Sequence, residues 1–283
     1  MNGAAQRPRP DGVAAYHSAM PAIPHGIDAL LFDMDGVLTD TARLHAAAWK
    51  QTFDEYLAGS RPEHRLDDRP GDRDRPGSGR PGMAGPDPRR PFALPEDYHR
   101  YVDGRPRYDG VRTFLASRGI TLEEPEVVAL GDRKNELLQA RLASDGVELY
   151  PDAEAFLRAA RAAGYRTALV SSSKNARAIV GAAGVLDLFD AIVDGTSLEP
   201  RGLRGKPAPD SFAAAAGDVG SDVAGAAVLE DAVAGVAAGR DGGFGLVVGV
   251  DRHDDPQPLL DGGADVVVSA LTDLTLDGGP AHA

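Results

Sequence analysis

The stretch Ile27–Gly36, which reads IDALLFDMDG, decides the fold of this 283-residue chain. Its short apolar run Ala29–Phe32 ends in two aspartates and a glycine, a pattern typical of a buried strand that ends at a turn. Further apolar segments follow later in the chain, separated by helical patterns: YRTALVSSS, DAIVDG, AAVLEDA, FGLVVGV and ADVVVS. Strands that alternate with helices predict an α/β fold, here a doubly wound, Rossmann-like parallel sheet.

A helical module is predicted between the first strand and the rest of the sheet. Residues 42–145 show helical patterns, which Gly110 and Gly119 are expected to interrupt. The predicted core consists of residues 26–41 and 146–275. Ligands bind at the carboxyl ends of the strands in sheets of this kind, and the module leaves the sheet at that end. The module is therefore expected to cover the site as a helical cap domain.

Two segments are predicted to be disordered because of their composition. Residues 1–25 are rich in Pro, Gly and Ala, and residues 59–91 are dominated by Pro, Gly and Arg. Such segments cannot bury enough apolar surface to offset the entropy that is lost on ordering. The second segment would follow the first cap helix, predicted over Thr39–Leu57, as a surface insertion whose arginines could also contact an acidic partner.

The composition excludes several classes of function. The net charge is −13, so nucleic acid and anionic membranes are not expected as partners. The absence of cysteine excludes disulfides and thiol nucleophiles, and the seven histidines show no zinc-type spacing. The sequence has no signal-peptide pattern and no apolar run that could span a bilayer. We therefore expect a cytoplasmic protein.

Several polar residues suited to phosphoryl transfer follow the predicted strands, and one more lies in a loop. Those after strands are Asp33, Asp35, Ser171, Glu230 and Asp231, and the loop residue is Lys206. Carboxylates are the ligands that Mg²⁺ prefers. One aspartate can attack phosphorus while a second exchanges a proton with the attacking or leaving oxygen. A serine and backbone amides at a strand-to-helix turn can hold an anion, and a lysine can balance its charge. These residues predict a phosphotransferase site at one edge of the sheet.

Four segments also resemble the motifs of a known superfamily. LLFDMDGVLTDT, LVSSSKN, GKPAPDSF and VLEDAVAGVAAG are similar, in this order, to the four motifs of the haloacid dehalogenase superfamily. The resemblance covers residues from about 27 to 250 apart from the insertion. Within the superfamily, the run from Asp33 to Trp49 and the later motifs are similar to the β-phosphoglucomutases.

The resemblance implies a role for each matching core residue. Asp33 would be the nucleophile and Asp35 the general acid/base, which also offers its backbone carbonyl to Mg²⁺. The predicted metal ligands are Asp33, Asp35, Glu230 and Asp231. Ser171 and Lys206 would hold the transferring phosphate.

A substrate site between cap and core is implied in the same way. Its residues would be Thr41, His45, Arg107, Lys134, Ser173, Lys174 and Asn175. Thr41 and His45 would lie at the hinge, and Arg107, in the segment GRPRYDGV, would bind the distal phosphate of the substrate. Lys134 would reach the sugar.

The motif residues also have simpler structural interpretations. The Asp-Gly pair after the first strand could be a plain turn, and the serine run 171–173 could be a helix cap. Lys206 could be a solvated loop cation, and His45 could be a packed surface histidine near Trp49.

The resemblance implies a mutase that converts β-glucose 1-phosphate to glucose 6-phosphate. Mg²⁺ would be the cofactor, and glucose 1,6-bisphosphate the intermediate or activator. A sugar-phosphate phosphatase of the same superfamily is the alternative, and it would need no grip on a second phosphate. A catalytically silent binding protein is a third hypothesis, but it would show a lost nucleophile or metal carboxylate, and all are present. We expect a monomer whose partner is a small phosphorylated sugar.

Overall fold

The fold rests on a parallel sheet that begins at the stretch quoted above. The computed structural model describes residues 20–59 and 89–276. Within these residues, six strands form one sheet in the order β3-β2-β1-β4-β5-β6, and all neighbours are parallel. The strands are β1 (Ala29–Phe32), β2 (Arg166–Val170), β3 (Ala191–Val193), β4 (Ala226–Glu230), β5 (Leu246–Val250) and β6 (Val266–Val268). The predicted α/β class is confirmed.

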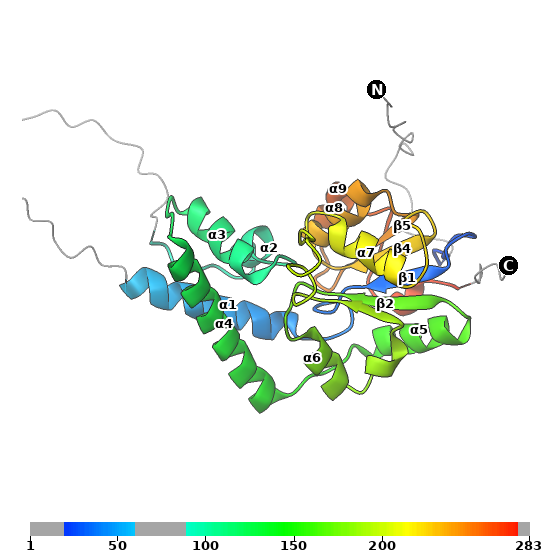
Figure 1. Cartoon of the computed structure of the whole chain (residues 1–283), viewed down its shortest axis with the longest axis horizontal. Coiled ribbons are helices and arrows are strands. Elements are labelled where there is room, and N and C mark those ends of the chain that lie inside the picture. The colour runs from blue at the N-terminus through cyan, green and yellow to red at the C-terminus, as the bar shows by residue number, and fades with distance from the viewer. Residues whose placement is uncertain (1–19, 60–88, 277–283) are drawn as a thin grey trace, which may run out of the picture.

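Helices cover both faces of the sheet, because the strands are apolar on both sides. In β1, Leu30 and Phe32 pack into one hydrophobic cluster. Ala29 and Leu31 pack into a second cluster on the other face. The first cluster includes α5 (Pro151–Ala162) and α6 (Ala176–Ala182), and the second includes α7 (Asp210–Asp218), α8 (Val233–Gly242) and α9 (Gln257–Gly262). Figure 1 shows α5 and α6 on the opposite side of the strands from α7, α8 and α9, which is the doubly wound arrangement.

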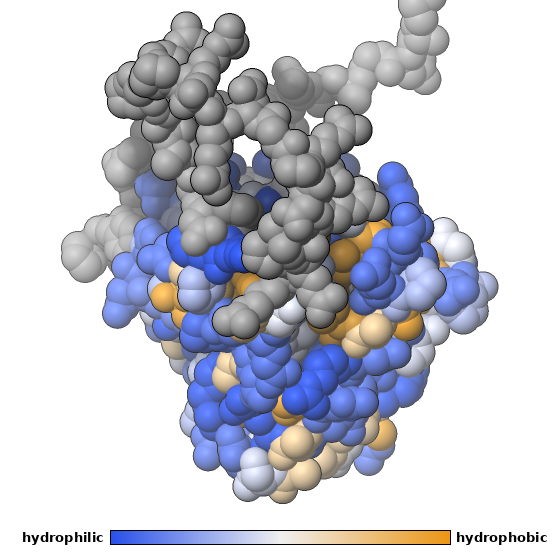
Figure 2. Space-filling view, turned by 90° about the vertical axis from the view of Figure 1, so that its left-hand side faces the viewer, coloured by the Kyte–Doolittle hydropathy of each residue, from blue (hydrophilic) through white to orange (hydrophobic). Residues whose placement is uncertain are grey.

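A second group of helices, here called the cap, lies beside the sheet. In the described part of residues 42–145 it consists of α1 (Ala42–Gly59), α2 (Glu96–Tyr101), α3 (Arg107–Ser117) and α4 (Glu124–Asp145). The cap has its own hydrophobic cluster, in which the ring centroids of Phe53 and Phe114 are 4.2 Å apart. Figure 1 shows the cap to the left of the sheet. Figure 2 shows a largely hydrophilic outer face on this side, with scattered apolar patches.

Two expectations about the cap helices are wrong. Helix α1 begins three residues after Thr39, because the hydroxyl and the backbone N–H of Thr39 both donate to the Met34 carbonyl, at 3.1 and 2.9 Å. Gly110 interrupts no helix but lies inside α3, where a Cβ atom would come 3.2 Å from the Trp49 ring. This glycine therefore allows α3 to pack closely on α1. Gly119, with φ +71°, does follow the end of α3 as expected.

Two segments that the sequence predicts to be disordered fall mainly outside the described residues. Of residues 1–25 only 20–25 are described, and of residues 59–91 only 59 and 89–91. Their disorder stays a prediction, as do the domain boundaries. Among the helices of the described ranges, none combines the length and the apolar character needed to cross a bilayer.

Candidate active site

The carboxyl ends of β1 and β4 bring three acidic side chains together. Phe32 pairs with Leu229 in these neighbouring parallel strands, so the residues that follow them lie level with each other. One ligand oxygen from each of Asp33, Glu230 and Asp231 lies within 4.8 Å of the other two. Asp33 is 6% exposed and Glu230 is fully buried. The acidic cluster is therefore built into the core and is not a solvated surface patch.

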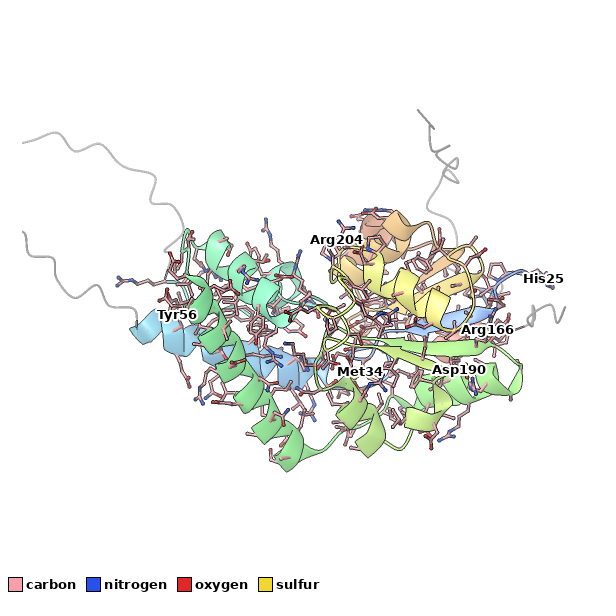
Figure 3. All side chains as sticks on the ribbon, in the orientation of Figure 1. His25, Met34, Tyr56, Arg166, Asp190 and Arg204 are labelled. Carbon is pink, nitrogen blue, oxygen red and sulfur yellow. The ribbon has the colours of Figure 1, made fainter. Side chains whose placement is uncertain are left out.

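The loop after β1 passes so close to Asp231 that it requires a glycine. Gly36 has φ +91°, a conformation that favours glycine, and a Cβ atom there would lie 1.8 Å from Asp231 Oδ2. Arg252 donates to the carbonyls of Gly36 and Val37, at 3.1 and 3.2 Å. Met34, labelled in Figure 3, belongs to this loop and lies between the sheet and the cap. These contacts hold the loop against the acidic cluster.

Lys206 supplies a positive charge inside the acidic cluster. Its Nζ donates to Asp33, to Glu230 Oε1 at 2.7 Å and to the carbonyl of Val170 at 3.2 Å. Burial acts to lower the pKa of Lys206, but Asp33 and Glu230 outweigh it and raise that pKa above its ordinary value. Because the residue is only 2% exposed, the alternative of a solvated loop cation is wrong.

The cluster fits a divalent cation that prefers oxygen ligands. Burial raises the pKa of Asp33, and Lys206 only partly offsets this. Burial also raises the pKa of Asp231, with Asp103 and Glu230 as the next contributions. A cation among these carboxylates would relieve their repulsion and their desolvation. Asp33, Glu230 and Asp231 are the residues that would hold it.

The carboxylate of Asp35 points toward the start of the cap. It accepts a hydrogen bond from the Thr41 hydroxyl, which itself lies 2.6 Å from the hydroxyl of Thr39. Nε2 of His45 is 3.5 Å from Asp35 Oδ1. The structure thus brings Asp35, Thr41 and His45 together. The side chain of Asp35 is outside the acidic cluster, and its backbone carbonyl as a metal ligand stays a prediction.

His45 is a neutral, largely buried side chain and no surface histidine. Burial lowers the pKa of His45 to about 4, although the nearby Asp35 acts to raise it. Nζ of Lys134 lies 3.1 Å from Nδ1 of His45. When Lys134 is protonated its ammonium group can only donate, so Nδ1 then accepts and the ring proton sits on Nε2, on the side of Asp35. The predicted cap residue Lys134 therefore contacts His45, whose ring lies beside Asp35.

Two more predicted substrate residues meet through Asn135. Arg107, in the first turn of α3, donates to Asn135 Oδ1 at 2.7 Å. Asn175, which follows β2, donates to the same oxygen at 2.9 Å. Nζ of Lys174 lies 5.3 Å from the centroid of the Tyr108 ring. Cap and core are therefore joined at the place where the distal phosphate was expected.

The serine run after β2 makes bonds within its own turn and one bond to the cap. Ser171 accepts from the Ser173 N–H at 3.1 Å, and Ser173 accepts from the Asn175 N–H at 3.2 Å. Ser172 donates to the carbonyl of Gly104 in the cap, at 2.8 Å. These bonds lie in the turn ahead of α6, whose N-cap Asn175 makes no side-chain cap hydrogen bond, so the helix-cap alternative is wrong. Phosphate binding by Ser171 stays a prediction.

Comparison with known proteins places the chain in a family. The family model described as haloacid dehalogenase-like hydrolase matches residues 27–243, a range that contains every residue of the site above except Arg252. The chain belongs to the haloacid dehalogenase-like hydrolases. This confirms the superfamily that the four sequence motifs indicate.

The chain is similar to β-phosphoglucomutases from several bacteria. A β-phosphoglucomutase from Mycobacterium bovis is 42% identical over 269 residues, which are 91% of this chain and 95% of that protein. A β-phosphoglucomutase from Bacillus subtilis is 31% identical over 88% of this chain and 92% of its own. The crystal structure of a β-phosphoglucomutase from Clostridium difficile has a TM-score of 0.65 at 23% identity, with 89% of this chain and 94% of that chain covered. The last likeness shows a shared fold.

Most of the predicted site residues line one cavity between cap and core. Those that line it are Asp33, Asp35, His45, Arg107, Lys134, Ser173, Lys174 and Asp231. The others do not line it: Thr41, Ser171, Asn175, Lys206 and Glu230. Thr41 bonds to Asp35, Ser171 and Asn175 bond to Ser173, and Lys206 bonds to Asp33, so these four support lining residues from outside the cavity. Glu230 in turn bonds to Lys206.

Four polar residues of the cavity wall are not among the predicted site residues: Tyr98, Asp103, Arg105 and Ser172. Asp103 lies 3.0 Å from Nδ1 of His99, and burial together with Asp103 raises the pKa of Tyr98, whose hydroxyl bonds to that carboxylate. Asp103 and Arg105 flank the glycine of the segment GRPRYDGV, and Ser172 lies between two predicted serines. Their nearness to these motifs is the signal that could have identified them.

Proposed function

We propose that the chain is a β-phosphoglucomutase, which converts β-glucose 1-phosphate to glucose 6-phosphate. Cationic side chains that approach one cavity from two directions support this function most directly. Lys206 stands behind Asp33 in the core, whereas Arg107 and Lys134 reach the same cavity from the cap. A mutase has to hold two phosphate groups at once, and this cavity offers positive charge for both. The relative that is 42% identical carries the same name.

Asp33 carries the phosphoryl group in this mechanism. A sugar hydroxyl attacks the phosphorus, the bond from phosphorus to Asp33 breaks, and Asp35 takes the proton of the hydroxyl. The product is glucose 1,6-bisphosphate, whose other phosphoryl group then passes to Asp33 while Asp35 returns the proton to the leaving sugar oxygen. The hydroxyl of Thr41 holds the carboxylate of Asp35 in place for both transfers, and the ring of His45 lies beside it.

Mg²⁺ is the proposed cofactor, held by Asp33, Glu230 and Asp231 and by the backbone carbonyl of Asp35. When bound, it neutralises part of the charge on the transferring phosphoryl group. Lys206 adds a fixed positive charge beside Asp33, in a site that excludes bulk water. Glucose 1,6-bisphosphate is the proposed activator, because Asp33 has to be phosphorylated before the first turnover.

A sugar-phosphate phosphatase is the alternative, with water as the final acceptor of the phosphoryl group. The contacts of cap with core around the cavity favour the mutase, which has to keep water away from Asp33. The monomeric state and the cytoplasmic location stay predictions.

A phosphorus NMR time course tests the function. The assay contains β-glucose 1-phosphate, Mg²⁺ and a trace of glucose 1,6-bisphosphate, with Asp33→Asn as the inactive control. Glucose 6-phosphate that appears without matching inorganic phosphate supports the mutase. Inorganic phosphate without glucose 6-phosphate would identify a phosphatase, and equal activity in Asp33→Asn would refute both.

A further inference from the structure

The loop between α2 and α3, residues 102–106, is here called the cap loop, and it packs against the core at two glycines. A Cβ atom on Gly104 would come 3.1 Å from Cβ of Ala232, which directly follows the acidic pair at the end of β4. A Cβ atom on Gly205, in the loop before the catalytic lysine, would come 2.2 Å from Cγ of Pro106. The cap loop therefore lies close against two core loops that carry catalytic groups.

One side-chain hydrogen bond joins the cap loop to a third core loop, the serine run after β2. The hydroxyl of Ser172 donates to the Gly104 carbonyl at 2.8 Å. Ser171 and Ser173 instead accept from N–H groups of their own turn. Of these three serines only Ser172 is bonded to the cap, and its hydroxyl takes no part in the chemistry proposed above. This leaves closure of the cap as the role that its geometry supports.

We propose that Ser172 is a positioning residue that holds the cap loop closed and so directs the phosphoryl group on Asp33 to the sugar and away from water. This role rests on the proposed mutase function. A phospho-aspartate is lost whenever water reaches it before the sugar hydroxyl does. In that side reaction the bond from phosphorus to Asp33 breaks, the oxygen of water enters inorganic phosphate, and Asp35 takes the proton. The frequency of loop opening therefore sets the share of hydrolysis.

The expected size of the effect follows from the loss of one neutral hydrogen bond. Ser172→Ala should shift the ratio of open to closed cap loop by about fivefold. The share of turnovers that end in inorganic phosphate should then rise by about fivefold, and amide exchange in residues 102–105 should speed up by a similar factor. Gly104→Ala should weaken the same hydrogen bond by displacing its acceptor. The new Cβ atom would crowd Ala232, and the φ of +66° is strained for alanine. It should act in the same direction.

The experiment compares the wild-type chain with Ser172→Ala and with a matched control, Ser144→Ala. The exposed hydroxyl of Ser144 also donates to a backbone carbonyl, that of Arg141 at 3.1 Å, but within its own cap helix. Phosphorus NMR measures the ratio of glucose 6-phosphate to inorganic phosphate. Hydrogen–deuterium exchange of the cap loop is followed separately, without substrate. Gly104→Ala replaces Ser172→Ala if the latter does not fold.

Both quantities should change in Ser172→Ala and stay at the wild-type value in Ser144→Ala. Unchanged exchange would show that Ser172 does not hold the loop, and faster exchange with an unchanged product ratio would show that loop closure does not control the acceptor. Either result overturns the proposal. If the wild-type chain itself forms no glucose 6-phosphate, the proposed mutase function fails, while the exchange data still decide whether Ser172 holds the cap loop.

Discussion

Lys134 and His45 contact each other where the cap joins the core, with Nζ of the lysine 3.1 Å from Nδ1 of the imidazole. Lys134 is 4% exposed and also lies 5.1 Å from the centroid of the Trp49 ring. Burial lowers the pKa of Lys134 to about 7 and the pKa of His45 to about 4. The lysine is thus held ready for an anionic ligand at a cost in the stability of the unliganded fold.

Replacing Lys134 with Met should remove that cost and weaken substrate binding. The pKa of Lys134 is about 7 in the folded chain and 10.5 for an exposed lysine, so between these values the unfolded chain binds more protons. Wild-type stability should therefore rise by about 2 kcal/mol from pH 7 to pH 9, and Lys134→Met should lack this rise. Urea unfolding at both pH values measures the difference. Lys50→Met, which removes a partly exposed lysine that bonds to Asp54 and to the Phe92 carbonyl, should keep the rise. If stability changed equally with pH in Lys134→Met and in Lys50→Met, Lys134 would not be a buried cation with a lowered pKa.

Removal of Lys206 should destabilise the fold far more than removal of its partner Asp33. Lys206→Ala leaves Asp33 and Glu230 buried without a counter-charge, which costs about 3–5 kcal/mol. Asp33→Asn should cost less than about 1 kcal/mol, because burial already raises the pKa of Asp33 and makes its charge unfavourable.

Lys206→Ala and Asp33→Asn should differ in stability but not in activity. Both variants should lose phosphoryl transfer by about 10³-fold or more. Thermal unfolding and the phosphorus NMR assay report the two effects independently. Lys50→Ala, which removes a partly exposed lysine, serves as the control, with an expected cost below about 1 kcal/mol. A Lys206→Ala variant as stable as this control would show that the acidic cluster does not depend on the lysine.

The sequence identified the sheet and the acidic cluster because both follow from residue types at strand ends. Asp33 and Glu230 end neighbouring parallel strands, so the topology alone brings them together. Ser172 and Asp103 lie beside motif residues, but the topology alone does not assign them a role, because their roles depend on how closely the cap loop approaches the core. That distance is set by packing between segments about 70 residues apart, and residue patterns do not record it.

Gly110 shows the same limit for a single residue. Glycine usually weakens a helix, so its place in the sequence suggested a break. The structure uses it for contact with Trp49, and Gly110→Ala should therefore destabilise the chain by about 1–2 kcal/mol in spite of the better helix propensity of alanine. Gly181→Ala is the matched control, because a Cβ atom there meets nothing within 4 Å in α6 and should stabilise by about 0.5 kcal/mol. Urea unfolding of the two variants would have to show opposite signs, and equal signs would contradict the close contact of α3 with α1.

Comparing Gly36 with Gly26 separates the cost of backbone strain from the cost of steric overlap. Its φ is +91°, and a Cβ atom would lie 1.8 Å from Asp231 Oδ2. Gly26 has a similar φ of +95°, but a Cβ atom there meets nothing within 4 Å. Gly26→Ala should therefore cost only the strain of a left-handed residue, about 1–2 kcal/mol.

Gly36→Ala should have the same backbone strain, and its Cβ atom should in addition displace the carboxylate of Asp231. We expect it to lose phosphoryl transfer by about 10²-fold or more, because a shift of a catalytic group by about 1 Å is enough for such a loss. Isothermal titration with Mg²⁺ should show weaker binding for Gly36→Ala and wild-type binding for Gly26→Ala, since only the first variant disturbs the carboxylate of Asp231, a proposed metal ligand. If both variants bound Mg²⁺ equally well, Asp231 would not be a ligand that the loop after β1 holds in place.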